Sequence, residues 1–202
     1  HNILVISDEI YEKLVYDGAE FVSIASLGPE IFERTVTVNG LSKSHSMTGW
    51  RIGYAGGPKA LISAINTLQS HSTSNAVTFC QDASVAALHD TSDFVERCRS
   101  TFEKRRDLIH GLLTSIPGIT CVKPLGAFYV FPDISSFYGK TIMGKTIANG
   151  LDFCAHLLET QYVAAVPGSA FDSDPHVRLS YATSEENIRE AVRRIAEFVK
   201  GV

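Results

Sequence analysis

The sequence lacks the features that define several protein classes. No apolar run approaches the roughly 18–20 residues that a helix needs to cross a bilayer, so no membrane span is expected. The four cysteines lie far apart and form no CxxC pair, which argues against a disulfide framework or a cysteine-based zinc site and indicates a reducing, cytoplasmic setting. The seven histidines show no HxxxH or HExxH spacing, so we expect no metal site.

Charge and composition exclude further classes of partner and of protein. The chain has 18 Lys and Arg against 22 Asp and Glu, a net charge of −4, and nothing indicates nucleic acid or an anionic membrane as a partner. With 45% hydrophobic and 20% charged residues, wholesale disorder is excluded. The 202 residues begin at His1, with neither a Met nor a signal-peptide pattern. We therefore expect an N-terminal portion of a longer protein to be missing.

The first half of the chain alternates strands and helices. Ile3–Ile6 is a short apolar run typical of a strand buried on both faces. Two more strands and two helices are predicted after it, in the order Thr35–Val38, Arg51–Ala55, Pro58–Gln69 and Val77–Leu88. This order indicates an α/β fold.

A single long helix is predicted near the middle of the chain. From Ser92 to Ile116 the apolar residues keep near-heptad spacing, with Arg106 as one interruption, until Pro117 and Gly118 end the pattern. A helix of this length with no partner in its own segment is expected to bridge two domains. We place the boundary inside it, which gives domains at residues 1–103 and 104–202.

The second half predicts a smaller α+β domain. Strands are expected at Ala127–Phe131, Val163–Val166 and His176–Ser180. A final helix opens with the capping box Thr183–Glu186 and carries an apolar face formed by Ile188, Val192, Ile195 and Val199.

The segment between the first of these strands and the next contains a possible phosphate loop. Gly139–Thr146 matches GxxxxGK[ST], a motif that needs a strand directly before it and a helix opening from its Lys-Thr pair. No strand is predicted directly before it, where Pro132–Ser136 stands, and Asn149-Gly150 is expected to break any helix after it. We therefore interpret Ser135–Gly150 as a surface loop.

Two residues follow the first strand at positions where chemistry is common. Asp8 comes two residues after the end of the apolar run, and the ligands of open α/β sheets gather at the carboxyl ends of strands. The alternative is that Asp8 caps the following turn. Tyr11, taken alone, is most simply a core or interface aromatic.

Lys43 and Arg51 flank a stretch rich in Gly, Ser and Thr between the second and third strands. A lysine with a lowered pKa can form a Schiff base, and the planar fork of arginine suits a phosphate dianion. Each residue alone is more often a solvated surface side chain.

Three segments together resemble a known family. Gly40–Gly53 resembles the pyridoxal-phosphate attachment signature of class I, fold-type-I aminotransferases at every constrained position. Ser7–Tyr11 is similar to the family segment upstream of the lysine, and Pro167–Phe171 followed by Val177–Ala182 resembles its substrate-arginine segment. The order is right and the match covers essentially the whole chain. His176–Glu186 most resembles the bacterial aspartate branch of the family.

The resemblance implies a fold, a cofactor and residue roles. The fold is the α/β C-terminal part of the large domain of a PLP-dependent transferase, followed by a small α+β domain. The cofactor is pyridoxal 5'-phosphate, which Lys43 binds covalently before moving a proton on the substrate. Asp8 pairs with the pyridine nitrogen, Tyr11 hydrogen-bonds the phenolic oxygen of the ring, and Arg51 binds the phosphate. Arg178 binds the substrate α-carboxylate.

The sequence also departs from the family pattern. Many members have a phosphate-contacting serine three residues before the lysine, where this chain has Gly40. The phosphate loop, the aromatic residue that stacks on the ring and an asparagine that contacts the ring oxygen belong to the family's N-terminal half and are absent here. Activity is therefore expected from the complete protein, as a homodimer with its active sites at the subunit interface.

The expected reaction is amino transfer between an L-amino acid, aspartate or glutamate, and a 2-oxo acid. Two alternatives remain open. A PLP-dependent lyase or a transaminase for other substrates would keep Lys43, Asp8 and Arg51 and differ in its product. A non-catalytic fragment acting as a binding module would show no cofactor absorption band.

Overall fold

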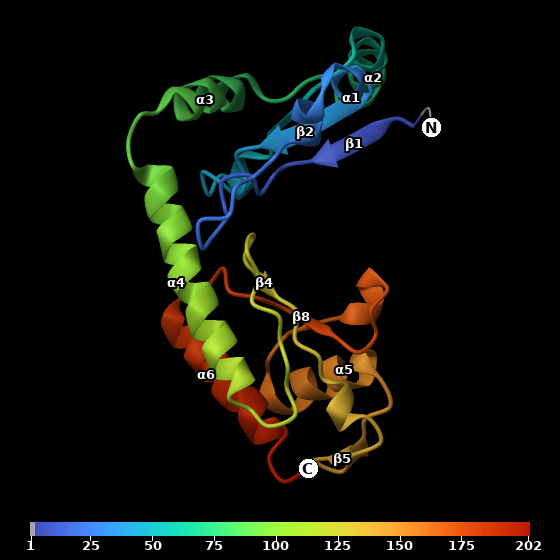
Figure 1. The fold of residues 1–202 in the computed structure, drawn as a ribbon, viewed down its shortest axis with the longest axis vertical. Helices are drawn as coiled ribbons and strands as arrows, with labels where there is room; N and C mark the ends of the chain where they lie inside the picture. Colours follow the sequence, from blue (N-terminus) through green and yellow to red (C-terminus); the bar gives the residue numbers. More distant parts are fainter. Residues whose placement is uncertain (1–2) are drawn as a thin grey trace. The chain divides into compact units, whose positions relative to one another are not determined.

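The computed structural model describes residues 3–202. His1 and Asn2 lie outside the described residues, and so does the point at which we expect a longer protein to continue. Contacts divide the chain into two compact units (Figure 1). Unit 1 ends at Arg99, and unit 2 comprises Ser100–Val202. The division falls inside the long helix α4 (Phe94–Thr114), a few residues before the boundary that we place from the sequence. No helix among residues 3–202 is long and apolar enough to cross a membrane.

Unit 1 contains a three-stranded sheet in the order β1-β2-β3. Its strands are β1 (Val5–Asp8), β2 (Thr35–Gly40) and β3 (Gly53–Gly56). β1 runs parallel to β2, with Val5 opposite Thr35, and β3 runs antiparallel to β2. The three strands predicted for this half are therefore present, although β2 continues through Asn39 and Gly40, two residues beyond its predicted end at Val38.

The predicted burial of the first strand is wrong. The side chain of Ile6 is 78% exposed, and those of Ile3 and Leu4 are 62% exposed. The physical reason is the place of β1 at the end of the strand order, because no described element of unit 1 covers these side chains. An apolar run predicts a strand, but its burial depends on the layers around it.

The helices of unit 1 are α1 (Pro29–Phe32), α2 (Lys59–Ser72) and α3 (Thr78–His89), with the short 3₁₀ helices η1 (Ile24–Leu27) and η2 (Thr48–Trp50). The two longer helices match the predicted ones within a few residues. We expect Pro58 at the first helical position of α2, but it is the N-cap and lies one residue before the helix begins. α2 has no buried residue, and all four residues of β3 are exposed.

Unit 2 has a closed core. Its antiparallel sheet has the order β4-β8-β7, formed by β4 (Tyr129–Val130), β8 (Val177–Ser180) and β7 (Val166–Pro167). Besides the part of α4 from Ser100 onward, the unit contains the helices α5 (Gly150–Gln161) and α6 (Glu185–Phe198) and the short 3₁₀ helices η3 (Ser135–Phe137) and η4 (Gly168–Phe171). Side chains from α4, α5, α6 and β8 meet around one small void: Leu113, Phe153, Leu157, Val177, Leu179 and Ile195. The predicted apolar face of α6 is buried as expected.

Arg106 interrupts the apolar pattern of α4 because it is a buried ion-pair residue. Its side chain is 0% exposed. Nε and Nη2 contact Oδ1 of Asp107 at 3.0 and 2.9 Å, and Nη1 donates to the carbonyl of Pro124 at 3.1 Å. The guanidinium thus ties α4 to the segment that leads into β4.

The expected loop at Ser135–Gly150 is more ordered than the sequence suggests. It contains a hairpin of β5 (Thr141–Ile142) and β6 (Lys145–Thr146), turned by Met143 and Gly144 with positive φ. A hairpin cannot form a phosphate loop, which agrees with our rejection of that motif. The segment is therefore a structured surface element.

No helix opens from Lys145-Thr146, but the helix α5, which is not predicted from the sequence, begins at Gly150. The side chain of Asn149 accepts a hydrogen bond from the amide of Asp152 at 2.9 Å and so caps the helix. A Cβ on Gly150 would lie 2.6 Å from the carbonyl oxygen of Asp174, so glycine permits a close backbone approach here.

The N-cap of α6 lies one residue after Thr183, the first residue of the predicted capping box. Ser184 is the N-cap, and its hydroxyl accepts from the amide of Asn187 at 3.2 Å.

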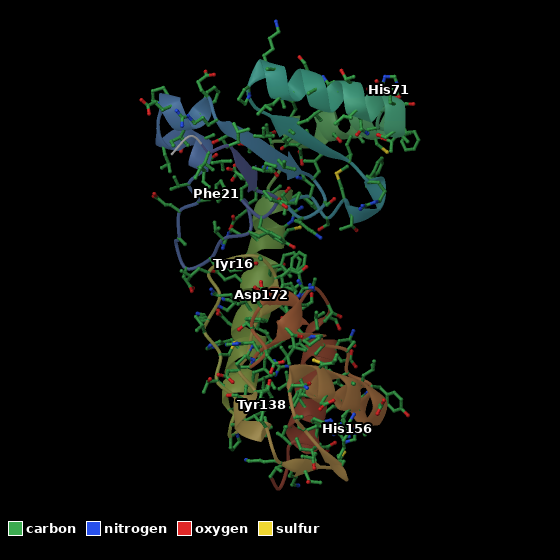
Figure 2. All side chains as sticks on the ribbon, turned by 90° about the vertical axis from the view of Figure 1, so that its right-hand side faces the viewer. Tyr16, Phe21, His71, Tyr138, His156 and Asp172 are labelled. Carbon is green, nitrogen blue, oxygen red and sulfur yellow. The ribbon has the colours of Figure 1, made fainter. Side chains whose placement is uncertain are left out.

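Two polar side chains of unit 2, Tyr138 and His156, are labelled in Figure 2. Tyr138 donates to the carbonyl of Asp174 at 2.7 Å, and Nε2 of His156 lies 2.9 Å from the carbonyl oxygen of Ile142.

Candidate active site

Four of the five candidate residues lie near one edge of the sheet in unit 1. β1 ends at Asp8, and β2, which runs in the same direction, ends at Gly40, three residues before Lys43. β3 is antiparallel, so Gly53 at its start lies opposite Gly40, and Arg51 comes two residues earlier. The strand directions therefore bring a carboxylate, an amine and a guanidinium to the same end of the sheet.

Asp8 is exposed, and it does cap the following turn. Its Oδ1 accepts a hydrogen bond from the amide of Ile10 at 3.2 Å. Within residues 3–202 the other oxygen, Oδ2, makes no hydrogen bond. The alternative reading from the sequence is thus compatible with a binding role, because the cap uses only one of the two carboxylate oxygens.

Glu9 is a buried carboxylate that we did not single out from the sequence. It is 5% exposed and accepts from the hydroxyls of Ser7 at 3.0 Å and Ser23 at 2.7 Å. Its amide donates to the carbonyl of Val38 at 2.9 Å, which extends the pairing of β1 and β2 by one residue. These bonds hold the segment that carries Asp8 in place.

Tyr11 and Lys43 lie in the turns that follow the first two strands. Both side chains are partly buried. The carbonyl of Tyr11 accepts from the amide of Leu14 at 2.9 Å, and the carbonyl of Lys43 accepts from Ser46 at 3.4 Å. Next to the lysine, Ser44 Oγ lies 2.8 Å from Nδ1 of His45. These bonds hold the backbone of the two turns that carry Tyr11 and Lys43.

There is little room for a side chain at Gly40. A Cβ there would lie 3.1 Å from the carbonyl oxygen of Ile52 and 3.2 Å from Cδ1 of Ile10. The segments after β1 and before β3 therefore both pack against the end of β2. A serine at this position would require its neighbours to shift by a few tenths of an ångström.

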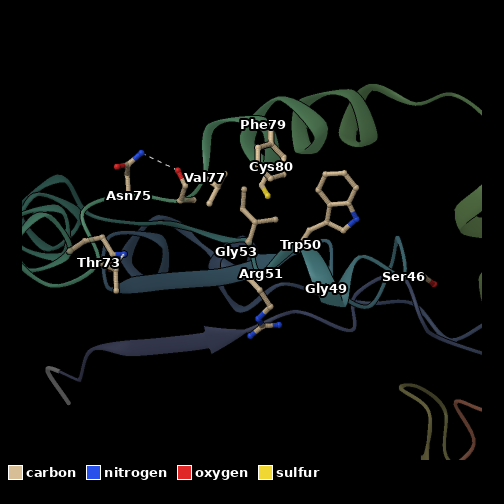
Figure 3. Close-up of a pocket in the computed structure, with 13 residues that line it drawn as sticks. Ser46, Gly49, Trp50, Arg51, Gly53, Thr73, Asn75, Val77, Phe79 and Cys80 are labelled. Carbon is tan, nitrogen blue, oxygen red and sulfur yellow. Dashed lines mark hydrogen bonds between the residues drawn. The ribbon is translucent and has the colours of Figure 1, made fainter.

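Arg51 has a left-handed backbone, with φ 53° and ψ 48°, a conformation that side chains other than glycine adopt infrequently. Its Nη1 donates to the carbonyl of Thr48 at 2.9 Å. In Figure 3 the Arg51 side chain points away from Phe79 and Cys80. The left-handed backbone at Arg51 thus directs the guanidinium to the side of β3 that faces away from α3.

A cavity of about 800 Å³ lies on the α3 side, lined among others by Trp50, Asn75 and Phe79 (Figure 3). The rings of Trp50 and Phe79 meet edge to face at 6.3 Å, but both remain exposed. Of the five candidate residues only Arg51 lines this cavity, so the cavity does not contain Asp8, Tyr11 or Lys43.

Arg178, the fifth candidate, belongs to unit 2. It lies in β8, where its neighbours Val177 and Leu179 are buried on one face of the strand and Arg178 is partly buried on the other. The carbon at the centre of its guanidinium lies 4.5 Å from the ring centroids of both Tyr129 and Phe171. These two aromatic contacts could not be found from spacing along the chain, although Phe171 ends one of the quoted motifs.

Comparison with known proteins decides the family. The sequence profile described as "Aminotransferase class I and II" matches residues 1–195. The chain belongs to this family. It is 51% identical over 200 residues to the aspartate aminotransferase of Geobacillus stearothermophilus, a match that covers 99% of this chain and 50% of the relative. It is 46% identical over 201 residues to the aspartate/prephenate aminotransferase of Cereibacter sphaeroides, with 99% and 50% covered.

Solved aminotransferase structures confirm the predicted fold. The crystal structure of the aspartate aminotransferase from Rhizobium meliloti matches with a TM-score of 0.93 and 48% identity, over 96% of this chain and 49% of that one. The fold is thus that of a PLP-dependent transferase, as the three motifs indicate. The chain spans about half the length of these relatives.

Proposed function

We propose that the complete protein is a PLP-dependent aminotransferase that moves an amino group between an L-amino acid, aspartate or glutamate, and a 2-oxo acid. The observation that carries the proposal is the grouping of Asp8, Lys43 and Arg51 at one sheet edge by the strand pairing. Family membership and relatives named aspartate aminotransferases support it. The aspartate/prephenate relative leaves the choice of oxo acid open.

The residues at the sheet edge fit pyridoxal 5'-phosphate by their chemistry. A lysine amine can bond to an aldehyde, a carboxylate can pair with a protonated ring nitrogen, and a guanidinium can bind a phosphate. When bound, this cofactor supplies an electron sink for the substrate α-carbon. Gly40 provides only backbone groups at a crowded position, and we assign it no role.

With the cofactor bound, each residue would have a defined role. Lys43 would hold the cofactor and act as the acid–base group for the proton of the substrate α-carbon. Asp8, through the oxygen that its turn does not use, would pair with the protonated ring nitrogen, and the hydroxyl of Tyr11 would donate to the ring oxygen. Arg51 would bind the phosphate, and Arg178 would orient the substrate by a bidentate contact with its α-carboxylate.

We further propose that the complete protein is a homodimer. Much apolar surface of unit 1 is uncovered by the described residues, including Ile6 at 78% and Leu68 at 73% exposure. Exposed apolar surface of this kind marks sites of association. Sedimentation that showed a fully active monomer would contradict this part of the proposal.

Purified full-length protein tests the function directly. We expect an absorption band near the visible edge that borohydride abolishes, together with formation of a 2-oxo acid from L-aspartate that depends on an added 2-oxo acid acceptor. Release of ammonia or of a cleaved fragment, with no amino transfer, would identify a lyase. A protein without the band and without turnover would support the binding-module alternative.

A further inference from the structure

Arg178 has unusual surroundings for a charged side chain. It lies in β8, the central strand of the sheet in unit 2, and its side chain is partly buried. Its guanidinium carbon is 4.5 Å from the ring centroid of Tyr129 and 4.5 Å from that of Phe171. Both distances are well inside the roughly 6 Å within which a cation is attracted to an aromatic face.

The two rings come from different sides of β8. Tyr129 lies in β4 opposite Ser180, which shares a sheet face with Arg178 because side chains alternate along a strand. Phe171 ends η4, which follows β7, the strand on the other side of β8. The arginine is therefore contacted by a residue of one neighbouring strand, β4, and by a residue of the 3₁₀ helix that follows the other, β7.

Further aromatic contacts hold Phe171. The ring of Phe131 meets it edge to face at 6.0 Å, and Phe131 itself stacks on His176 at 4.8 Å with an angle of 11°. Nδ1 of His176 lies 2.9 Å from the hydroxyl of Ser173. The ring beside Arg178 thus belongs to a packed row, which limits its rotation.

The guanidinium retains its hydrogen-bonding capacity. In the described part of the chain its N–H groups form no hydrogen bond or ion pair with another residue. The contrast with other arginines of unit 2 is clear: Arg106 pairs with Asp107, and Arg193 and Arg194 pair with Glu190. Aromatic faces attract a cation without neutralising it, whereas a carboxylate would compete with an anionic ligand.

We propose that Tyr129 and Phe171 are positioning residues that form an aromatic clamp for Arg178 and set the preference for a substrate with a free α-carboxylate. The clamp, defined as these two rings, restrains the guanidinium while its N–H edge stays available. A planar carboxylate accepts two parallel hydrogen bonds from such an edge, and a neutral amide does not. The inference rests on the proposed function, in which Arg178 binds the substrate.

The test uses the full-length protein loaded with its cofactor. The probe is 2-methyl-L-aspartate, which has no α-proton to lose, so calorimetry measures its binding without turnover. Phe171→Leu and Tyr129→Leu each remove one ring, while Phe171→Tyr and Tyr129→Phe are matched controls that keep it. Phe171 is 44% exposed, so its replacement leaves the buried core of unit 2 intact.

We expect each Leu variant to raise the dissociation constant of the probe about three- to thirtyfold, the range for one cation–π contact, and each control to stay near wild type. The kcat/KM for L-aspartate should fall in the same variants, while that for its α-amide stays unchanged. Equal losses for acid and amide would reveal a merely structural effect and overturn the clamp.

The arginine variant separates the two proposals. If Arg178→Ala abolishes binding of the probe but the Leu variants bind like wild type, the clamp is wrong and the proposed function stands. If Arg178→Ala binds the probe like wild type, the proposed role of this arginine is wrong, and the clamp fails with it. Failure of the wild-type protein to bind the probe would contradict both proposals.

Discussion

Replacing the buried Arg106 should lower the free energy of unfolding through two separable effects, the loss of its polar contacts and the loss of its packing. Arg106→Met removes the guanidinium but fills most of the space of its stem, whereas Arg106→Ala also empties that space. The guanidinium donates to the carbonyl of Pro124 and pairs with Asp107, and it is 0% exposed. The two variants therefore separate polar contacts from packing.

The magnitude follows from these contacts. A hydrogen bond to a charged group contributes about 1.5–3 kcal/mol, and the pair with Asp107, which is 51% exposed, adds at most about 1 kcal/mol. Because methionine is neutral, the variant also avoids the cost of burying a charge, which offsets part of this loss. We expect a net cost of about 1–2 kcal/mol for Arg106→Met and at least about 2 kcal/mol more for Arg106→Ala, from the emptied volume.

Urea unfolding of the full-length protein, followed by circular dichroism, measures both costs. Asp107→Asn is the matched control: it keeps the shape of the side chain and removes its charge, and with it the ion pairs that Oδ1 makes with Arg106 at 2.9 Å and with Lys123 at 3.0 Å. We expect this control to cost less than about 1 kcal/mol. Equal costs for the Met and Ala variants, or a Met variant as stable as wild type, would refute the reasoning.

Three further predictions concern the site and the fold. Lys43→Ala should reduce transamination by more than the roughly 10²–10⁴-fold that proton transfer alone supplies, and borohydride should no longer fix pyridoxyl to peptide 40–53; recovery of that labelled peptide from the variant would contradict the assignment. Arg178→Lys should raise KM for both the amino acid and the oxo acid and lower kcat, with no change in the absorption spectrum without substrate; wild-type kinetics would show that the carboxylate is bound elsewhere. Burial raises the pKa of the Cys154 thiol from 9.0 to about 11, so the unfolded chain loses its proton first and stability should fall as the pH rises through this window. Cys154→Ala should lessen that fall in urea midpoints between pH 8 and pH 11, and an unchanged fall would argue against the shift.

Local patterns predict the elements well where the signal is local. The apolar runs of β1 and β2, the amphipathic repeat of α4 and the face of α6 all appear near their expected places. α5 is the main omission, because Asn and Gly at residues 149 and 150 suggest a break when their geometry is that of a cap. The same residue types serve both purposes, and only the backbone that follows distinguishes them.

Burial and partnership depend on residues distant in sequence. Ile6 belongs to an apolar run but is exposed, because no element among the described residues covers it. Arg106 is charged but buried, because the carbonyl of Pro124 accepts a hydrogen bond from its guanidinium. Likewise the motifs identify Arg178, but its contacts with Tyr129 and Phe171 arise from the strand order β4-β8-β7. Chemistry-bearing residues can be named from sequence, and their environment requires the tertiary structure.

The grouping of the candidate residues depends on strand direction more than on distance along the chain. Asp8 and Lys43 are separated by more than thirty residues, yet the parallel pairing of β1 and β2 places the ends of both strands together. If β3 were also parallel to β2, its start, and Arg51 with it, would lie at the opposite end of the sheet. The antiparallel register, with Gly53 opposite Gly40, returns the chain to the edge where the lysine lies. The segment from Gly40 to Gly53 can thus present an amine and a guanidinium to one ligand, because it leaves the sheet and re-enters it at the same end.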